Sequence, residues 1–469
     1  MKKRDFLRLS GLGGIGLLNF NPQGASVPQG ILSRQGGAPH FNMCGYRAPK
    51  IDTVRIGYIG LGNRGGGAMK RIIHLENVEV KALCDIRSEK AEEAKKVLKG
   101  QKYQPQLYSG SVDAWKKLCE RDDIDLVYIC TPWSLHAPMA LYAMEQGKHV
   151  AVEIPAATTV EDCWRLVETS ERTKKHCMML ENCCYDFFEM LTLNMARQGY
   201  FGEIVHAEGA YIHEIFESLF DKEQRYDLWR LRENERNGNL YPTHGLGPVA
   251  QIMNINRGDK MDYLVSMSSN DFMLEAEARQ LAAKDPAFAE FQNETFRGNM
   301  NTSTIRTAKG KTIMLQHDVT SPRVYTRHHT ISGTKAAAQK YPFNGPEELG
   351  RVSKGHQWLD KEAFAKLEKE YQPEMITRFG ELAKKVGGHG GMDFLMDWRL
   401  IDCLRNGLAL DQDVYDASAW SVVGPLSEYS VAHRSNSVDI PDFTRGAWKS
   451  NSPVDISLKE GGDTGVRMG

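Results

Sequence analysis

Three glycines near the start of the chain, Gly60, Gly62 and Gly65, have the spacing of a loop that binds a dinucleotide. They follow an apolar run and precede a helical segment, which is the context that this fingerprint requires. Gly60 allows a tight turn, Gly62 lets the backbone approach a pyrophosphate, and Gly65 permits close packing of the helix on the strand. The N-terminus of the helix then faces the phosphates with free N–H groups. We therefore expect a dinucleotide cofactor.

An acidic residue, Asp85, stands 20 positions after Gly65, at the end of the second apolar run. A carboxylate there accepts hydrogen bonds from the adenosine ribose hydroxyls and repels a 2′-phosphate, so we expect NAD rather than NADP. The alternative is that Asp85 only caps the next helix. Another mononucleotide is disfavoured because the loop has no Gly-Lys-Ser or Gly-Lys-Thr sequence.

The elements that position this loop alternate between short β-branched runs and helical stretches. Strands are expected at 54–59, 78–84, 126–130, 149–152 and 178–180, and helices near 66–74, 87–98, 111–119, 135–146 and 159–174. Such alternation is typical of a parallel, doubly wound sheet. We predict an α/β chain whose NAD-binding Rossmann domain spans residues 51–186.

After about residue 187 this alternation fades. Longer strand-like segments at 203–212, 263–269, 303–308, 312–319 and 324–332 favour a mostly antiparallel sheet. Helical stretches near 361–385 and 392–408 are expected to cover that sheet or to return to the first domain. The prediction is a substrate-binding α+β domain over residues 187–445, followed by a C-terminal tail over 446–469.

The first fifty residues differ in composition from the rest. Lys2, Lys3 and Arg4 precede an apolar, glycine-rich stretch from Gly11 to Leu18, and a polar linker follows. This start resembles a twin-arginine export signal, although Lys3 replaces the first arginine and no clean Ala-x-Ala site follows. We expect residues 1–50 to be the export signal and linker of a periplasmic protein. A frayed cytosolic terminus is the alternative.

Charge and cysteine content limit the partners. The chain has 59 basic and 60 acidic residues, so no net field favours nucleic acid, and no apolar run has the length of a membrane span. Nine cysteines lack the spacing of a disulfide framework, so we expect reduced structural thiols. His328 and His329 have no ligand partners at useful spacing, so no metal is expected. The expected substrate is small and weakly charged.

Two further segments, Thr131–His136 and Glu153–Pro155, follow the fourth and fifth strands. Both lie at carboxyl ends of parallel strands, where ligands bind. They resemble the glucose-fructose oxidoreductase and inositol dehydrogenase superfamily over roughly residues 52–440, in which such segments flank the nicotinamide. Ile154 replaces the lysine that relays a proton in ordinary dehydrogenases of that superfamily. The usual Asp-x-x-x-His segment of the second domain is also not found.

A second set of residues is more specific. It comprises Asn63-Arg64, Trp133–His136, Glu153-Ile154, Glu181-Asn182, Tyr211, Trp229-Arg230 and the string Tyr-Pro-Thr-His-Gly-Leu-Gly-Pro at 241–248. This set resembles glycosyl hydrolase family 109, whose members are NAD-dependent N-acetylgalactosaminidases. The resemblance adds these residues to the glycines and Asp85 as NAD contacts: Asn63, Arg64, Trp133, Ser134, Leu135, His136, Glu153, Ile154 and Asn182. The implied sugar contacts are Tyr211, Arg230, Tyr241, Pro242, Thr243, His244 and Tyr325.

The resemblance implies redox-neutral hydrolysis with NAD as a resident cofactor. Sugar C3 is oxidised, a base removes the acidified C2 proton, and the aglycone leaves from C1 with acid assistance. Water then adds, C2 is reprotonated and C3 is reduced again, which releases terminal N-acetylgalactosamine from a glycan or small molecule. An NAD-dependent sugar or inositol dehydrogenase is the main alternative, and a non-catalytic sugar sensor is a third.

Three residues are candidates for catalysis. His244 is the strongest acid/base candidate because imidazole titrates near neutral pH, and flanking proline and glycines predict a stiff loop; a structural histidine is the alternative. Tyr185 acts as a base only with a lowered pKa, and a core tyrosine fits nearly as well. Glu153 is expected to bind nicotinamide ribose or substrate unless it caps a helix. His389 fits functional and structural roles equally. A homo-oligomer is expected by analogy only.

Overall fold

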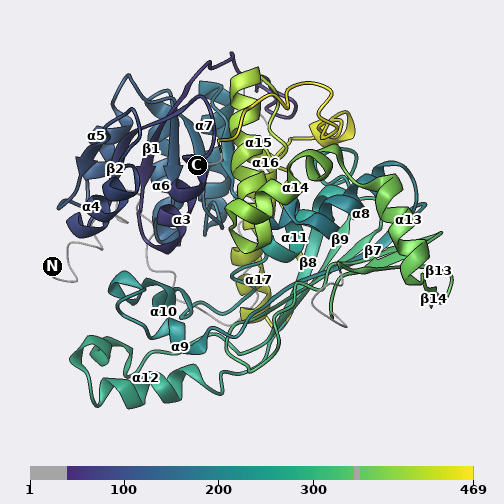
Figure 1. The fold of residues 1–469 in the computed structure, drawn as a ribbon. Helices are drawn as coiled ribbons and strands as arrows, with labels where there is room; N and C mark the ends of the chain where they lie inside the picture. Colours follow the sequence, from purple (N-terminus) through teal and green to yellow (C-terminus); the bar gives the residue numbers. More distant parts are fainter. Residues whose placement is uncertain (1–39, 343–348, 468–469) are drawn as a thin grey trace.

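The computed structural model describes residues 40–342 and 349–467, which form two α/β units (Figure 1). Within these residues the first unit has six parallel strands in the order β3-β2-β1-β4-β5-β6. They are β1 (Val54–Ile59), β2 (Val78–Cys84), β3 (Gln106–Tyr108), β4 (Leu126–Ile129), β5 (His149–Val152) and β6 (Cys177–Met179). This is the strand order of a dinucleotide-binding Rossmann fold, so the predicted doubly wound sheet is confirmed.

The strands of this sheet are apolar because helices cover it. β4 and β5 are buried at every position, as expected in a parallel sheet. The helices are α3 (Asn63–Ile72), α4 (Ser88–Val97), α5 (Ala114–Cys119), α6 (His136–Glu145) and α7 (Val160–Thr173). The sequence does not predict β3, because its three partly exposed edge residues form no apolar run.

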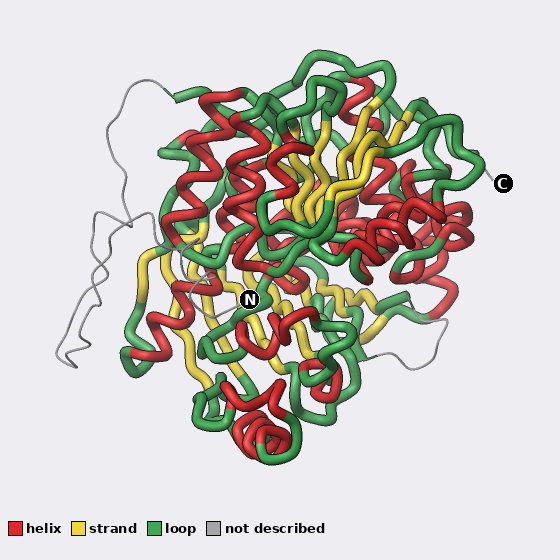
Figure 2. Tube along the Cα trace, turned by 90° about the vertical axis from the view of Figure 1, so that its left-hand side faces the viewer, coloured by secondary structure: helices red, strands yellow, loops and turns green. Residues whose placement is uncertain are grey.

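The second unit is a sheet with nine strands among the described residues, in the order β14-β13-β12-β11-β7-β10-β9-β8-β15. Figure 2 shows the strands of the two sheets as separate yellow groups. The strands are β7 (Ile204–Ile212), β8 (Met261–Ser268), β9 (Asn301–Thr307), β10 (Thr312–Asp318), β11 (Thr330–Gly333), β12 (Ala337–Gln339), β13 (Arg351–Lys354), β14 (Gln357–Trp358) and β15 (Val438–Asp439). Only β7 and β10 pair in parallel, which confirms the mostly antiparallel sheet. In place of the strand expected at 324–332, the structure has only the shorter strand β11.

Helix α11 (Thr243–Ile252) lies directly on β7, between the sheet and the rest of the molecule. A Cβ atom at Gly245 would lie 2.3 Å from the amide nitrogen of Ala210, and one at Gly209 would lie 2.4 Å from the carbonyl oxygen of Gly245. Both positions need glycine because the two backbones touch. The expectation of a stiff loop around His244 is therefore wrong: the segment is a helix whose glycines allow close packing.

The chain returns to the first domain through its last long helices. The stretch expected at 361–385 is two helices, α13 (Lys361–Tyr371) and α14 (Glu374–Val386), separated at Pro373. Proline is favoured at the start of a helix and disfavours continuation of a preceding one, because it lacks an N–H group and its ring clashes with the preceding turn. Helix α15 (Met392–Asn406) packs against α3 and β1 of the Rossmann sheet (Figure 1).

The C-terminal tail is part of the nucleotide domain. Asp402 of α15 accepts hydrogen bonds from the amide and hydroxyl of Thr464, and Val466 forms an antiparallel bridge with Leu75. The amide of Arg467 donates to the carbonyl of His74 at 2.7 Å. These contacts hold the tail on the Rossmann unit.

All nine cysteines lie in the described residues and are free, and seven of them are buried, as predicted for structural thiols. No helix of the described segments combines the length and apolar character that crossing a membrane requires. The predicted export signal lies outside the described residues and stays a prediction.

Candidate active site

The glycine-rich loop has the geometry of a phosphate cradle. Gly60 has a φ of +87°, and a Cβ atom at Gly65 would lie 1.9 Å from the carbonyl oxygen of Gly60, so both must be glycine. At Gly62 the nearest atom to an added Cβ is 3.8 Å away, at the guanidinium of Arg87, which is an ordinary contact and leaves the backbone uncrowded. Helix α3 starts at Asn63 without a side-chain cap. Its first N–H groups therefore suit a pyrophosphate.

Asp85 joins this loop to the end of β2. Its buried carboxylate accepts hydrogen bonds from the amide of Leu61 at 2.7 Å and from the amide of Arg87 at 2.9 Å. Arg87 precedes α4, so the carboxylate also supports the start of that helix. A contact between Asp85 and the adenosine ribose stays a prediction.

A polar cluster lies at the carboxyl ends of β5 and β6. The Nε atom of Arg64 donates to Glu153 at 2.9 Å, and its Nη1 atom donates to Asp393 at 3.2 Å. Asn182 of η2 (Asn182–Tyr185) donates to the same Asp393 carboxylate. Burial alone would raise the pKa of Asp393, but the His389 hydrogen bond and the charges of Arg64 and Arg71 hold it below its usual range. Arg64 thus bridges Glu153 to an aspartate that the sequence did not identify, and this aspartate also binds Asn182.

Aromatic rings from both units gather in one wall. Trp133 of η1 (Trp133–Leu135) stacks on Tyr241 with ring centroids 5.4 Å apart, and Tyr211 of β7 lies 4.5 Å from Tyr241. The guanidinium carbon of Arg230, in α10 (Trp229–Glu233), is 5.1 Å from the Tyr241 ring. We call Trp133, Tyr211, Arg230 and Tyr241 the aromatic wall. Flat apolar faces next to a fork of donors suit an acetamido sugar.

His244 forms a pair with a buried carboxylate beside this wall. Its Nδ1 atom lies 2.8 Å from Oε1 of Glu181, which is fully buried, and its ring centroid is 5.0 Å from that of Tyr241. Burial alone would raise the pKa of Glu181, but His244 holds it below the usual range. A Cβ atom at Gly247 would lie 2.8 Å from Cγ of Glu181, so the glycine makes room for the carboxylate. The Glu181–His244 pair leaves Nε2 of the imidazole for a substrate.

A second histidine, His213, was not predicted. Its Nδ1 atom is 2.9 Å from the hydroxyl of Tyr211, and its ring centroid is 4.9 Å from that of Tyr325. Arg327 donates to the hydroxyl of Tyr325 at 3.1 Å. Burial and the charge of Arg230 lower the pKa of His213. The signal in the sequence was its position two residues after Tyr211, because alternate strand residues share a face.

Tyr185 does not reach this site. Its hydroxyl donates to Asp411 at 3.3 Å, its side chain is buried, and burial raises its pKa well above the usual value. A base needs the opposite shift. The suggestion that Tyr185 acts as the base therefore conflicts with the geometry, and the alternative of a core tyrosine fits.

The remaining predicted contacts differ in exposure. His136 is buried, with Nδ1 at 2.7 Å from the carbonyl of Pro155 and Nε2 at 2.7 Å from the carbonyl of Thr131, so both ring nitrogens join loops, and its contact with the dinucleotide stays a prediction. Of the other predicted contact residues, Asn63 and Ser134 are exposed, Leu135 is half-buried, and Ile154, Pro242 and Thr243 are buried. For these six the predicted contacts stay predictions.

Glu181, Cys183 and His244 place one potential metal ligand each within 4.8 Å of one another. The 2.8 Å distance between the Glu181 oxygen and the His244 nitrogen is that of a hydrogen bond. Burial raises the pKa of the Cys183 thiol, whereas the thiolate is the form that binds metals. These atoms are better suited to holding a proton than a cation.

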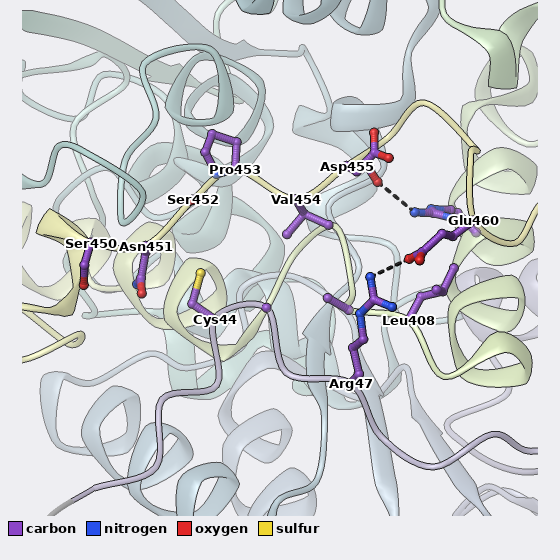
Figure 3. Close-up of a pocket in the computed structure, with 13 residues that line it drawn as sticks. Cys44, Arg47, Leu408, Ser450, Asn451, Ser452, Pro453, Val454, Asp455 and Glu460 are labelled. Atoms are coloured by element: carbon purple, nitrogen blue, oxygen red, sulfur yellow. Dashed lines mark hydrogen bonds and ion pairs between the residues drawn. The ribbon is translucent and has the colours of Figure 1, made fainter.

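A cavity of about 350 Å³ lies elsewhere, where the N-terminal segment, α15 and the C-terminal tail meet (Figure 3). Arg399 donates to the carbonyl of Asp455 at 3.2 Å on its wall, and Arg47 pairs with Glu460. None of the predicted site residues lines this cavity.

Two family models together match most of the chain. The model described as "Glycosyl hydrolase 109, C-terminal domain" matches residues 185–450, and "Oxidoreductase family, NAD-binding Rossmann fold" matches residues 54–181. A "Glycosyl hydrolase family 109 protein" from Shewanella pealeana is 47% identical over 462 residues, covering 97% of this chain and 99% of its own. An "Alpha-N-acetylgalactosaminidase" from Bacteroides fragilis is 50% identical over 414 residues, covering 87% and 96%.

Solved structures share the fold at low identity. Aldose-aldose oxidoreductase from Caulobacter crescentus has a TM-score of 0.59 at 18% identity, covering 83% of this chain and 100% of that one. Myo-inositol dehydrogenase from Lactobacillus casei, solved with NAD(H) and myo-inositol, has a TM-score of 0.56 at 16% identity, covering 84% and 99%. A nucleotide-binding Rossmann domain is thus combined with a glycosidase-family domain, and the chain belongs to glycosyl hydrolase family 109.

Proposed function

We propose that the protein is a glycosidase that removes terminal N-acetylgalactosamine with NAD as a resident cofactor. The Glu181–His244 pair beside the aromatic wall carries this proposal, because it supplies a proton-transfer group where Ile154 cannot. The name of the Bacteroides fragilis relative supports the choice of sugar.

The residues of the nucleotide domain fit the cofactor. The uncrowded backbone at Gly62 and the uncapped start of α3 would hold its pyrophosphate, and Glu153 and Asn182 would lie near its nicotinamide half. Bound NAD supplies reversible acceptance of a hydride from sugar C3.

His244 moves the proton at sugar C2. A ketone at C3 acidifies the C2–H bond, so the neutral Nε2 atom removes this proton while Glu181 holds Nδ1 and stabilises the imidazolium. The aglycone leaves from C1 and takes up a proton, and water adds at C1 and releases one. The imidazolium exchanges its proton with solvent and then protonates C2. Since the hydride also returns to C3, the net reaction is hydrolysis.

The aromatic wall orients the sugar. Trp133 and Tyr241 stack on each other, and Arg230 is a donor fork beside both rings. A sugar held on these rings keeps its C2 and C3 atoms in a fixed position relative to His244 and the glycine-rich loop. This is how binding contributes to a near-attack geometry.

The test uses purified protein with para-nitrophenyl α- and β-N-acetylgalactosaminides, with and without added NAD, in deuterated water. We expect aryl release, deuterium at C2 of the product and no net NADH. Net NADH formation would indicate the dehydrogenase, and turnover without C2 exchange would contradict the elimination.

Variant H244A should lose at least about a hundredfold in kcat and should lose C2 exchange. The matched control is H433A, since the His433 ring is stacked on Tyr429 outside the site, and it should behave like the wild type. C2 exchange that survives in H244A would reject the assigned role of His244.

A further inference from the structure

The turn between α14 and α15 has an unusual backbone. Residues Gly387, Gly388, His389, Gly390 and Gly391 have φ values of 91°, 86°, 46°, 72° and 109°. A left-handed conformation is unfavourable for an L residue with a side chain, and His389 is the one residue of the five that has one. Such a conformation persists only where the surroundings hold it.

A buried carboxylate holds His389 in this conformation. Its Nδ1 atom lies 2.9 Å from Oδ2 of Asp393, whose side chain is 2% exposed, whereas the His389 side chain is 59% exposed. A Cβ atom at Gly388 would lie 2.7 Å from Cβ of Asp393, so glycine at this position permits the contact. The hydrogen bond to a buried carboxylate thus fixes the position of an exposed imidazole, as in a binding site.

The imidazole lies beside the phosphate cradle. The same Oδ2 atom accepts a hydrogen bond from Arg64 at 3.2 Å, and Arg64 lies in the first turn of α3, directly before Gly65 of the glycine-rich loop. Nδ1 of His389 is 3.5 Å from the Arg64 guanidinium. Among the described residues, none forms a hydrogen bond with Nε2 of His389.

We propose that His389 is a cofactor-binding residue. In this proposal the 387–391 loop closes over the dinucleotide, and Nε2 binds its ribose-phosphate oxygens and slows its release. The inference rests on the proposed function, because a cofactor that is oxidised and reduced on the same sugar must stay bound through many turnovers. A dehydrogenase that exchanges its cofactor has no need of such a loop.

The test measures release of NAD and not catalysis. Protein loaded with radiolabelled NAD is mixed with excess unlabelled NAD, and retained label is followed over time. H389A should release NAD at least about tenfold faster than the wild type, as expected for the loss of a hydrogen bond to a charged group. H389Q, which keeps a donor and an acceptor, should recover part of the difference. Release from H389A within twofold of the wild type would overturn the proposal.

Two glycine variants test the effect of the loop conformation apart from that of the His389 side chain. Gly390 and Gly355 both have a φ of +72°, and an added Cβ atom at either position meets nothing within 4 Å. G390A should release NAD faster, whereas G355A, in the turn between β13 and β14, should match the wild type. Equal release from both variants would also overturn the proposal.

Failure of this inference and failure of the proposed function give different results. If H389A releases NAD faster but the wild type cleaves no glycoside, only the proposed function fails. If the wild type cleaves the glycoside and H389A retains NAD normally, only the role of His389 fails. A melting temperature for each variant confirms that it is folded.

Discussion

The Oε1 atom of Glu181 lies 2.8 Å from Nδ1 of His244, and the carboxylate is completely buried. A carboxylate in this position selects the ring tautomer with a proton on Nδ1 and fixes the orientation of the ring. Glu181 is thus a positioning residue that acts through His244.

Variant E181Q should lower kcat about ten- to a hundredfold, the usual cost of losing a carboxylate behind a functional histidine. It keeps the size of the side chain but removes the charge that orients the ring. The loss should fall on kcat and leave KM nearly unchanged, because Glu181 acts through His244 and not on the sugar. The matched control is E208Q, since Oε1 of Glu208 lies 3.7 Å from Nε2 of His206, outside the site. A role in folding alone would lower stability without lowering kcat of the folded protein.

Variant G247A should disturb the Glu181–His244 pair by displacing Glu181. The added Cβ atom would lie 2.8 Å from Cγ of Glu181 and 3.0 Å from Sγ of Cys184, so the carboxylate must shift. We expect kcat to fall at least tenfold and the free energy of unfolding to drop by about 1–3 kcal/mol, as in overpacked cores. Both are measurable by aryl release and urea unfolding.

The control for that variant is G424A, also a helical glycine. The nearest atom to its added Cβ is 3.7 Å away, which is an ordinary contact. It should keep full activity and gain up to about 1 kcal/mol of stability, because alanine favours the helix. A G247A variant that matched G424A would show that the glycine is not needed for the position of Glu181.

Variant Y185F tests whether this tyrosine takes part in catalysis. Its hydroxyl contacts Asp411, so we expect kcat to stay within about threefold and the free energy of unfolding to fall by about 1 kcal/mol. Y415F is the comparison, because the buried Tyr415 hydroxyl donates to Glu171 at 2.8 Å. A hundredfold loss of kcat in Y185F alone would restore Tyr185 as a base.

The pKa of Asp393 predicts a pH dependence of stability. Since that pKa is lower in the folded protein than the usual value of about 3.9, ionised Asp393 stabilises the fold above this pH. The stabilisation is lost as the pH falls through the lower, folded-state value. D393N should therefore be less stable than the wild type by about 3 kcal/mol near pH 7, and the difference should shrink in acid.

Urea unfolding between pH 3 and pH 7 measures this difference. D123N is the control, because Asp123 pairs with Arg121 at the surface, where ion pairs contribute less than about 1 kcal/mol. A difference between wild type and D393N that stayed constant across this range would contradict the prediction.

The Rossmann sheet was predictable because each buried strand needs a continuous apolar run. The glycine-rich loop was predictable because steric limits require glycine at fixed positions along it. The same logic fails for β3, which is short and at an edge. It also fails for the segment at 241–248, where glycines suggested a loop. There glycine serves helix packing, which depends on a partner strand that the local sequence does not reveal.

Most residues that the sequence placed at the site do meet there, but their partners were not predictable. Glu181 and His244 are 63 positions apart, and Asn182 and Asp393 are 211 positions apart. No local periodicity links residues at such separations. Tyr185 is the opposite case. Its residue type suits proton transfer, but its side chain lies in the core, where its hydroxyl donates a hydrogen bond to Asp411.

The position of the tail has a consequence for the order of folding. His74 lies beside β2 and Arg467 near the end of the tail, 393 positions apart, yet their contact belongs to the nucleotide domain. A ribosome delivers the strands of that domain early, but its contacts with the tail form only after residue 467 has been synthesised. A chain that stops before the tail leaves the Rossmann unit without these contacts.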